Sequence, residues 1–275
     1  MVSERMAASR VAEEKARQEI VRVCQLLWQR GYVSASDGNV SVRLGPDRLL
    51  TTPSGVSKGF LGSGQLVVTD LSGELLSDQT EEAKGLRPSS ELRMHCEAYR
   101  QRPDIGAVVH AHPPITTACT VAGFSLEACV LPEVVLTLGA IPTARYATPG
   151  TAQVAESIRE LIREFDALAL ERHGAVTVGA TAFEAYLRLE KVEHTALIVQ
   201  AAYQLGGVLP LPAEEVQRLR AMRRRMRGLP VEGDDEGCLL SVGDEDLRGV
   251  VHGPEQALAE RIAQAVLHEL RKPGP

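Results

Sequence analysis

Residues 87–112 read RPSSELRMHCEAYRQRPDIGAVVHAH and carry the pattern of a helix followed by a strand. Pro88 prevents a helix from extending backward, and the two serines that follow it offer capping oxygens, so a helix is predicted to begin there. Leu92, Cys96 and Tyr99 then recur at the spacing of one helical face. The turn RPD ends this helix, and the β-rich run IGAVVHAH is predicted to form a short strand.

The segments on either side alternate between the same two periodicities. Helical patterns cover residues 5–30, 113–122, 151–165 and 181–205, and apolar runs bounded by turns lie near residues 40–44, 47–55, 65–76, 166–174 and 174–179. Because helices and strands interleave, we predict an α/β fold, a three-layer α/β/α sandwich. Hairpin-like pairs, such as the one expected around Ser72–Gly73, favour a mixed or largely antiparallel central sheet over a doubly wound one.

The length and composition of the chain limit its organisation. Its 275 residues, 44% of them hydrophobic, are enough to bury a sizeable core. We predict one domain over residues 1–228. Residues 229–275 shift to an acidic, glycine-rich composition with one further helical pattern at 254–271, and we interpret them as an appendage of unknown role.

Several classes of protein are disfavoured by charge and hydropathy. The formal net charge of −6 argues against a nucleic-acid-binding surface, and the basic run Arg223–Arg225 is interpreted as a solvated helix face. No apolar run is long enough for a membrane span, and the first residues lack the apolar core of a signal peptide, so a cytoplasmic location is expected. The five cysteines form no C-x-x-C pair and are expected to be reduced core thiols.

The sequence VVHAHPP, residues 108–114, is the strongest local sign of chemistry. Alternate residues of a strand point the same way, so His110 and His112 would project from one face as a pair of metal ligands. A pair of surface or hydrogen-bonded histidines is the alternative interpretation. His173 is the best third ligand, because it ends an apolar strand and precedes Gly174, which permits a sharp turn. Three imidazoles would leave a zinc ion one open position for catalysis.

The remaining histidines carry weaker signals. His95 lies next to the apolar face of its helix and is interpreted as a satisfied core residue. His194, on the long helical pattern 181–205, could reach the site, but a structural role is favoured. His252 and His268 lie in the tail and receive no role.

Glu91 is the candidate acid/base. It occupies the first turn of its helix, where a capping carboxylate is the alternative interpretation. The turn after this helix leads directly into the histidine strand, which could bring Glu91 to the metal. Three small-residue loops could offer hydroxyl and N–H groups to an anion: Ser36–Asn39, Thr52–Gly55 and Ser89–Ser90.

Taken together, these segments resemble the class II aldolase/adducin family, and within it the fuculose-1-phosphate aldolase-like branch. The resemblance runs from about residue 10 to about residue 220, and the matching stretches are SASDGNVSVR, TTPSGVSKG, residues 87–112, ARYATPGT and LERHGAVTVG. It implies a single α/β/α domain with a mainly antiparallel sheet. It also implies a homotetramer of C4 symmetry, with active sites between subunits.

The resemblance assigns roles to individual positions. His110, His112 and His173 would bind Zn²⁺, with Mn²⁺ or Co²⁺ as alternatives, and Glu91 would be the catalytic acid/base. The substrate phosphate would be held by Ser36, Asn39, Ser54, Gly55, Ser89 and Ser90. The implied reaction is reversible cleavage of a ketose 1-phosphate to dihydroxyacetone phosphate and an aldehyde, in which zinc acts as a Lewis acid and Glu91 moves a carbon-bound proton.

One position departs from the family pattern. The fuculose enzymes place a tyrosine of the neighbouring subunit where this chain has Leu131, so the resemblance does not assign the proton donor on the aldehyde side. Glu133 is a nearby candidate, with a salt bridge at the rim as the alternative interpretation. Dehydration, as in the methylthioribulose-1-phosphate dehydratases, is the second interpretation. The ribulose-phosphate 4-epimerases have Asp at the position of Glu91, which disfavours epimerisation. Adducin-like scaffolds lack the three histidines, which disfavours a non-catalytic module.

Overall fold

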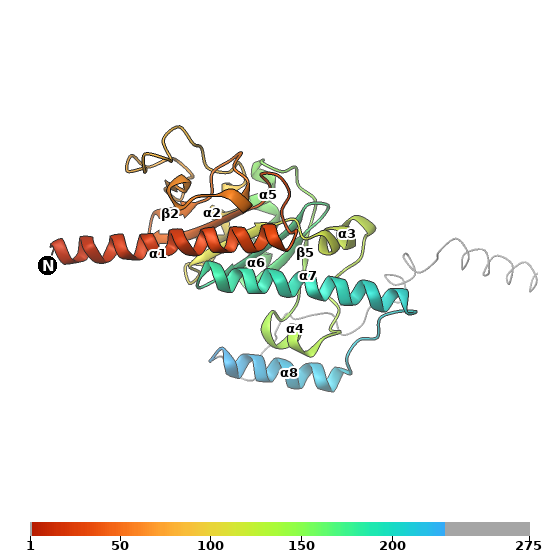
Figure 1. Ribbon diagram of the computed structural model, residues 1–275. Coiled ribbons are helices and arrows are strands. Elements are labelled where there is room, and N and C mark those ends of the chain that lie inside the picture. The colour runs from red at the N-terminus through yellow and green to blue at the C-terminus, as the bar shows by residue number, and fades with distance from the viewer. Residues whose placement is uncertain (1, 229–275) are drawn as a thin grey trace, which may run out of the picture.

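The computed structural model describes residues 2–228, and Figure 1 shows helices on both sides of one central sheet. The predicted helix at 254–271 and the histidines His252 and His268 lie outside the described residues. Among residues 2–228, no helix has the length and apolarity that a membrane span needs.

The sheet has seven strands in the order β3-β2-β1-β4-β7-β6-β5. Every neighbouring pair is antiparallel except β5 and β6, which are parallel. The predicted mainly antiparallel sheet is therefore confirmed. The strands are β1 Asn39–Gly45, β2 Arg48–Thr51, β3 Val67–Thr69, β4 Ala107–Ala111, β5 Thr143–Ala144, β6 Ala167–Leu170 and β7 Gly174–Gly179.

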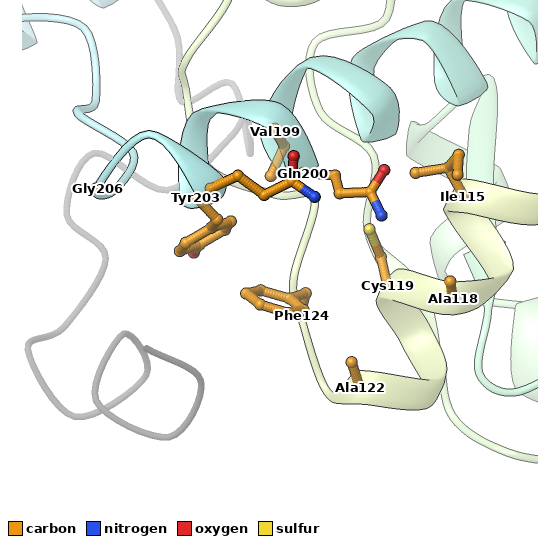
Figure 2. Close-up of a pocket in the computed structure, with 10 residues that line it drawn as sticks. Ile115, Ala118, Cys119, Ala122, Phe124, Val199, Gln200, Tyr203 and Gly206 are labelled. Carbon is orange, nitrogen blue, oxygen red and sulfur yellow. The ribbon is translucent and has the colours of Figure 1, made fainter. Parts of the chain in front are cut away.

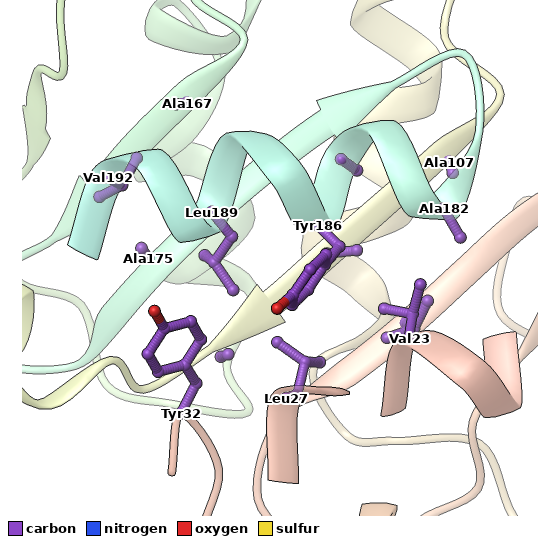
Figure 3. Close-up of a cluster of buried hydrophobic side chains, with 14 of the residues drawn as sticks. Val23, Leu27, Tyr32, Ala107, Ala167, Ala175, Ala182, Tyr186, Leu189 and Val192 are labelled. Carbon is purple, nitrogen blue, oxygen red and sulfur yellow. The ribbon is translucent and has the colours of Figure 1, made fainter. Parts of the chain in front are cut away.

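Helices cover both faces of this sheet, as the sandwich prediction requires. They are α1 Val2–Gln29, α2 Leu92–Gln101, α3 Pro114–Ala122, α4 Pro132–Thr137, α5 Ala152–Ile158, α6 Leu161–Glu164, α7 Ala182–Gln204 and α8 Ala213–Met226, with short 3-10 turns η1 Lys58–Phe60 and η2 Ser63–Gln65. One apolar cluster joins α1, α3 and α7 to the sheet, and Figure 3 shows Leu27, Tyr186 and Leu189 within it. A second cluster joins α2, α5 and α6 to the other face.

The alternation of side chains along β4 determines toward which face of the sheet His110 points. Val109 and Ala111 belong to the α1/α7 cluster, whereas Val108 belongs to the α2 cluster. Burial of each valine stabilises the fold by about 1.5–3 kcal/mol. A shift of the register by one residue would turn these side chains to the opposite faces and lose that stabilisation. His110 has the same parity as Val108 and so faces the α2 layer.

Two predicted elements differ in detail. Helix α2 begins at Leu92 rather than at the serines, because the backbone there is used elsewhere: Pro88 forms a β-bridge with Pro53. Glu91 is thus the residue that precedes the helix, and its side chain makes no capping bond. The hairpin at Ser72–Gly73 reduces to a single bridge, because the Asp70 carboxylate accepts the backbone N–H groups of Ser72 and Glu74.

Two expectations about side chains are corrected. Cys24, Cys96 and Cys119 are buried free thiols as predicted, but Cys129 is disulfide-bonded. Cys238 lies outside the described residues. The basic run is not wholly solvated, because the side chain of Arg223 is buried against α4 and donates to the Leu138 carbonyl at 3.1 Å.

Candidate active site

His110 lies one residue before the end of β4 and is fully buried. Its Nδ1 atom lies 2.9 Å from the carbonyl oxygen of Ala175 on β7. A carbonyl only accepts, so this contact places the proton on Nδ1 and leaves the lone pair on Nε2. A hydrogen bond of this kind orients a metal-binding histidine and sets its tautomer.

The other two predicted ligands come from the chain segments next to β4. His112 follows β4, and its backbone N–H donates to the Tyr32 carbonyl at 2.8 Å. His173 lies in the turn between β6 and β7. The Nε2 atoms of His110 and His112 are 3.1 Å apart, and the three rings have centroid separations of 4.7–5.0 Å. The predicted three-histidine cluster is therefore formed in the structure.

Gly174 is needed for close approach rather than for the turn that the sequence suggested. A Cβ atom at this position would lie 2.3 Å from the Ala111 oxygen and 2.9 Å from His112 Cδ2. The left-handed backbone of the turn belongs to Arg172, with φ of 56°. The missing side chain thus lets β7 pack against the end of β4 beside two of the histidines.

Glu91 lies between the histidines. Its Oε1 atom is 2.9 Å from His173 Nε2, and its Oε2 atom is 3.3 Å from His110 Nε2. Oε2 also accepts from Asn39 Nδ2 at 2.9 Å, whereas the buried Oε1 has no hydrogen bond of adequate geometry. An oxygen without a hydrogen-bonding partner beside three imidazoles is a natural position for a cation.

The four side chains fit a divalent metal in geometry and in charge. One potential ligand atom from each of Glu91, His110, His112 and His173 lies within 4.8 Å of the others. Burial raises the pKa of Glu91, but the neighbouring His110 and His173 outweigh that effect and hold the pKa well below its usual range. Burial and the neighbouring histidines lower the pKa of His112 to about 3. An ionised carboxylate and neutral imidazole are the forms that bind metals.

Most of the predicted phosphate loops lie side by side around this cluster. Pro53 bridges to Pro88, and Ser54 N–H donates to the Arg87 carbonyl at 2.8 Å. Asn39 Nδ2 lies 3.2 Å from Ser89 Oγ, which joins the first loop to the third.

The other three predicted phosphate residues have looser ties to this group. Among residues 2–228, Ser36 is connected through its carbonyl, which accepts from Lys58 Nζ at 2.7 Å. Gly55 adopts φ of 74°, and Ser90 lies near Gly150. A phosphate-binding role for the six residues stays a prediction.

Several polar residues near the site were not singled out from the sequence. Asp37 lies 3.7 Å from His112 Nδ1, and Lys58 is buried behind the first two loops. Asp37 lies inside the quoted SASDGN motif, which is a signal that could have identified it. Lys58 has no sequence signal that distinguishes it from a surface lysine. His95 is buried as predicted. Its Nδ1 atom lies 2.7 Å from Ser41 Oγ, whereas its Nε2 atom has no hydrogen-bonding partner among residues 2–228. His194 is exposed.

The residues considered for the aldehyde side lie at the start of α4. Leu131 immediately precedes this helix and packs, partly buried, against the α1/α7 cluster. Glu133 is in the first turn of α4 and is exposed. Their roles toward a substrate stay predictions.

A separate cavity of about 500 Å³ lies between α3 and α7. Figure 2 shows its largely apolar lining, including Ile115, Cys119, Phe124, Val199 and Tyr203. None of the predicted site residues lines it, so the cavity is distinct from the histidine cluster.

Comparison with known proteins agrees with this site and fold. The family model of the Class II Aldolase and Adducin N-terminal domain matches residues 18–199. The chain therefore belongs to the class II aldolase and adducin family. An L-fuculose phosphate aldolase of Methanococcus vannielii is 38% identical over 179 residues, which cover 65% of this chain and 92% of that protein. The predicted resemblance, including its fuculose-phosphate aldolase-like branch, is confirmed.

Relatives and solved structures that resemble this chain are named for more than one reaction. The 3-oxo-tetronate 4-phosphate decarboxylase of Escherichia coli K12 is 33% identical over 215 residues, covering 76% of this chain and 97% of that protein. The crystal structure of Escherichia coli YgbL has a TM-score of 0.67 at 32% identity and covers 76% of this chain and 99% of its own. An L-fuculose 1-phosphate aldolase structure has a TM-score of 0.67 at 26% identity, covering 75% and 94%. The family therefore includes more than one reaction.

Proposed function

We propose that this chain is a divalent-metal-dependent lyase that breaks a carbon–carbon bond of a small sugar phosphate and releases dihydroxyacetone phosphate. The observation that carries the proposal is the position of Glu91, whose two carboxylate oxygens lie 2.9 Å from His173 and 3.3 Å from His110. Residues 1–228 would form the catalytic domain, and residues 229–275 an appendage.

His110, His112 and His173 would hold the metal, and Glu91 could touch it when no substrate is bound. Zinc suits three imidazoles best, and Mn²⁺ or Co²⁺ are alternatives. A bound divalent cation would supply Lewis-acid stabilisation of negative charge that develops on a substrate ketone oxygen. The protein fixes the ligand set through the Ala175 carbonyl at His110 and the Tyr32 carbonyl at the His112 backbone.

The leading reaction is aldol cleavage of a ketose 1-phosphate. The bond between C3 and C4 breaks, its electron pair stays on C3, and the C4 hydroxyl loses its proton as the aldehyde forms. Glu91 would deliver a proton to C3, which yields dihydroxyacetone phosphate, and would remove that proton in the condensation direction. Asn39 would orient the carboxylate through its hydrogen bond to Oε2, at 2.9 Å.

Decarboxylation of a 3-oxo acid phosphate is the second candidate. It is supported by the decarboxylase relative, which is 33% identical and of which 97% is covered. In that reaction the bond between the carboxylate carbon and C2 breaks, CO₂ leaves, and the electron pair stays on C2. A proton from Glu91 would again give dihydroxyacetone phosphate, so one set of residues serves both reactions.

The phosphate of either substrate would be held by the loops around the cluster. We assign this role to Ser36, Asn39, Ser54, Gly55, Ser89 and Ser90. Support comes from the contacts between Asn39 and Ser89 and between Ser54 and Arg87, which keep three loops together. Binding energy from a non-reacting phosphate can be used to orient the reacting carbon.

A coupled assay tests the proposal and separates its two forms. Zinc-loaded protein is mixed with L-fuculose 1-phosphate or with 3-oxo-tetronate 4-phosphate, and dihydroxyacetone phosphate is followed through its reduction by NADH and glycerol-3-phosphate dehydrogenase. Lactaldehyde as the co-product indicates aldol cleavage, and CO₂ indicates decarboxylation. If zinc-, manganese- and cobalt-loaded protein all release no dihydroxyacetone phosphate from either compound, while the relatives do, the proposal is wrong.

A further inference from the structure

Lys58 is a buried cation whose charge the described protein does not pair. The residue opens η1 and is 1% exposed. Its Nζ atom donates to the carbonyl oxygens of Ser36 at 2.7 Å and of Val56 at 2.9 Å. Both acceptors are neutral. A buried ammonium costs several kcal/mol in desolvation, and proteins normally offset that cost with a carboxylate.

No such carboxylate contacts Lys58 among residues 2–228, where none lies within 4.0 Å of Nζ. Burial lowers the pKa of Lys58, and the negative charges of Asp37 and Glu91 oppose that shift from a greater distance. An anion that is not part of the protein would offset the cost of burying this charge.

The two carbonyls that Lys58 binds lie in the loops assigned to the phosphate. Ser36 begins the loop that leads to Asn39, and Val56 directly follows Ser54–Gly55. These loops also contact the third one, through Asn39 to Ser89 and Ser54 to Arg87. Lys58 is thus the residue that ties the first loop to the second, and its charge lies beside both.

We propose that Lys58 is a positioning residue for a phosphate monoester dianion, holding the Ser36 and Ser54–Gly55 loops at a fixed spacing and attracting the anion with its charge. This inference rests on the proposed function and adds to it the cation that the six predicted phosphate residues lack, since those supply only hydroxyl, amide and backbone groups. Because Lys58 acts through the loops, it affects substrate binding more than the chemical step.

The test compares Lys58→Met, which removes the charge at similar length, with Lys58→Arg, which keeps it. Lys84→Met is the matched control, because Lys84 is exposed and pairs with Glu81 on the surface. Inorganic phosphate is titrated into each zinc-loaded protein by calorimetry, and kcat and KM are measured with the substrate found by the coupled assay. Metal content and the unfolding temperature show whether each variant is folded.

Lys58→Met should weaken phosphate binding and raise KM by roughly tenfold or more, as expected for one charge at short range in a partly buried site. Its kcat should change less than KM, its zinc content should stay at the wild-type level, and Lys84→Met should match the wild type. If Lys58→Met does not fold, ¹⁵N-lysine NMR replaces it as the test. The lysine signal that is present in the wild type and missing in Lys58→Arg is assigned to Lys58. That signal must shift when phosphate is added to the wild type.

The outcomes separate this inference from the proposed function. If the wild type binds phosphate and releases dihydroxyacetone phosphate while Lys58→Met binds phosphate equally well, the inference is overturned and the function stands. An unshifted Lys58 signal overturns it in the same way. If the wild type neither binds phosphate nor releases dihydroxyacetone phosphate, the proposed function fails, and the inference fails with it.

Discussion

Three of the four candidate ligands, Glu91, His110 and His112, have a contact that leaves a potential metal-binding atom free. The Ala175 carbonyl fixes the tautomer of His110, and Asn39 binds only one of the two Glu91 oxygens. Asp37, 3.7 Å from His112 Nδ1, is placed to orient that ring from the solvent side. Residues that support ligands in this way often matter for metal affinity almost as much as the ligands.

The first prediction at this scale concerns metal content. Purified wild-type protein should carry about one zinc per chain, and His110→Ala or His173→Ala should lose most of it, because two imidazoles and a carboxylate hold zinc less tightly than the full set. His194→Ala is the control, since His194 is exposed on α7. Elemental analysis after dialysis measures the occupancy. Equal zinc in His110→Ala and His194→Ala would place the metal elsewhere.

The second concerns the aldehyde. By the predicted resemblance, Leu131 is apolar where the fuculose enzymes have a phenol, so a hydroxyl of the aldehyde would lose a partner, which costs about 1–3 kcal/mol. We expect acetaldehyde to be preferred over L-lactaldehyde in condensation with dihydroxyacetone phosphate. Specificity constants for the two aldehydes measure the preference, and Leu131→Tyr should shift it toward lactaldehyde. A wild-type preference for lactaldehyde would show that another residue donates the proton.

At the scale of elements, Glu193 on α7 determines where α3 begins. Its carboxylate accepts from Ile115 N at 2.9 Å, Thr116 N at 2.8 Å and Thr116 Oγ1 at 2.7 Å, and the residue is only 7% exposed. A carboxylate at a helix N-terminus is favoured by the helix dipole and by the free N–H groups there. Since α3 follows His112 after one residue, this contact also fixes the chain just past a proposed ligand.

Glu193→Gln should lower the free energy of unfolding by about 1–3 kcal/mol, because the amide cannot accept all three bonds and has no charge. Glu156→Gln, at an exposed position of α5, should change it by less than about 0.5 kcal/mol. Urea denaturation followed by circular dichroism measures both. If the two variants are equally stable, the contact to α3 contributes nothing net.

At the scale of the whole molecule, local patterns predicted the features that depend on neighbours in sequence. The alternation along VVHAH placed His110 and His112 on one face, and the interleaved periodicities indicated the sandwich. The start of α2 was misplaced because Pro88 pairs with Pro53, far away in sequence. The contacts of Asn39 with Glu91 and of Lys58 with Ser36 join residues 52 and 22 positions apart, and no periodicity predicts such pairs.

The assembly also belongs to this scale, and we propose a homotetramer with active sites between subunits. Phe60, Leu205 and Leu209 are 77%, 89% and 89% exposed in the single chain, and exposed apolar residues of this kind often lie in interfaces. Light scattering should give about four times the chain mass of 29.7 kDa. A mass of one chain at micromolar concentration would contradict the tetramer. The predicted cytoplasmic location stays a prediction.

The central claim is that Glu91, beside a metal held by three histidines, moves a proton on the hydroxymethyl carbon of dihydroxyacetone phosphate. Hydrogen exchange tests this without any knowledge of the second substrate. Zinc-loaded protein is incubated with dihydroxyacetone phosphate in D₂O, without aldehyde, and proton NMR follows that carbon. The account predicts uptake of one deuterium by the wild type, at least about a hundredfold slower uptake with Glu91→Gln at unchanged zinc content, and none with the metal-free protein. Exchange by Glu91→Gln at the wild-type rate, or no exchange by fully metal-loaded wild type, would contradict it.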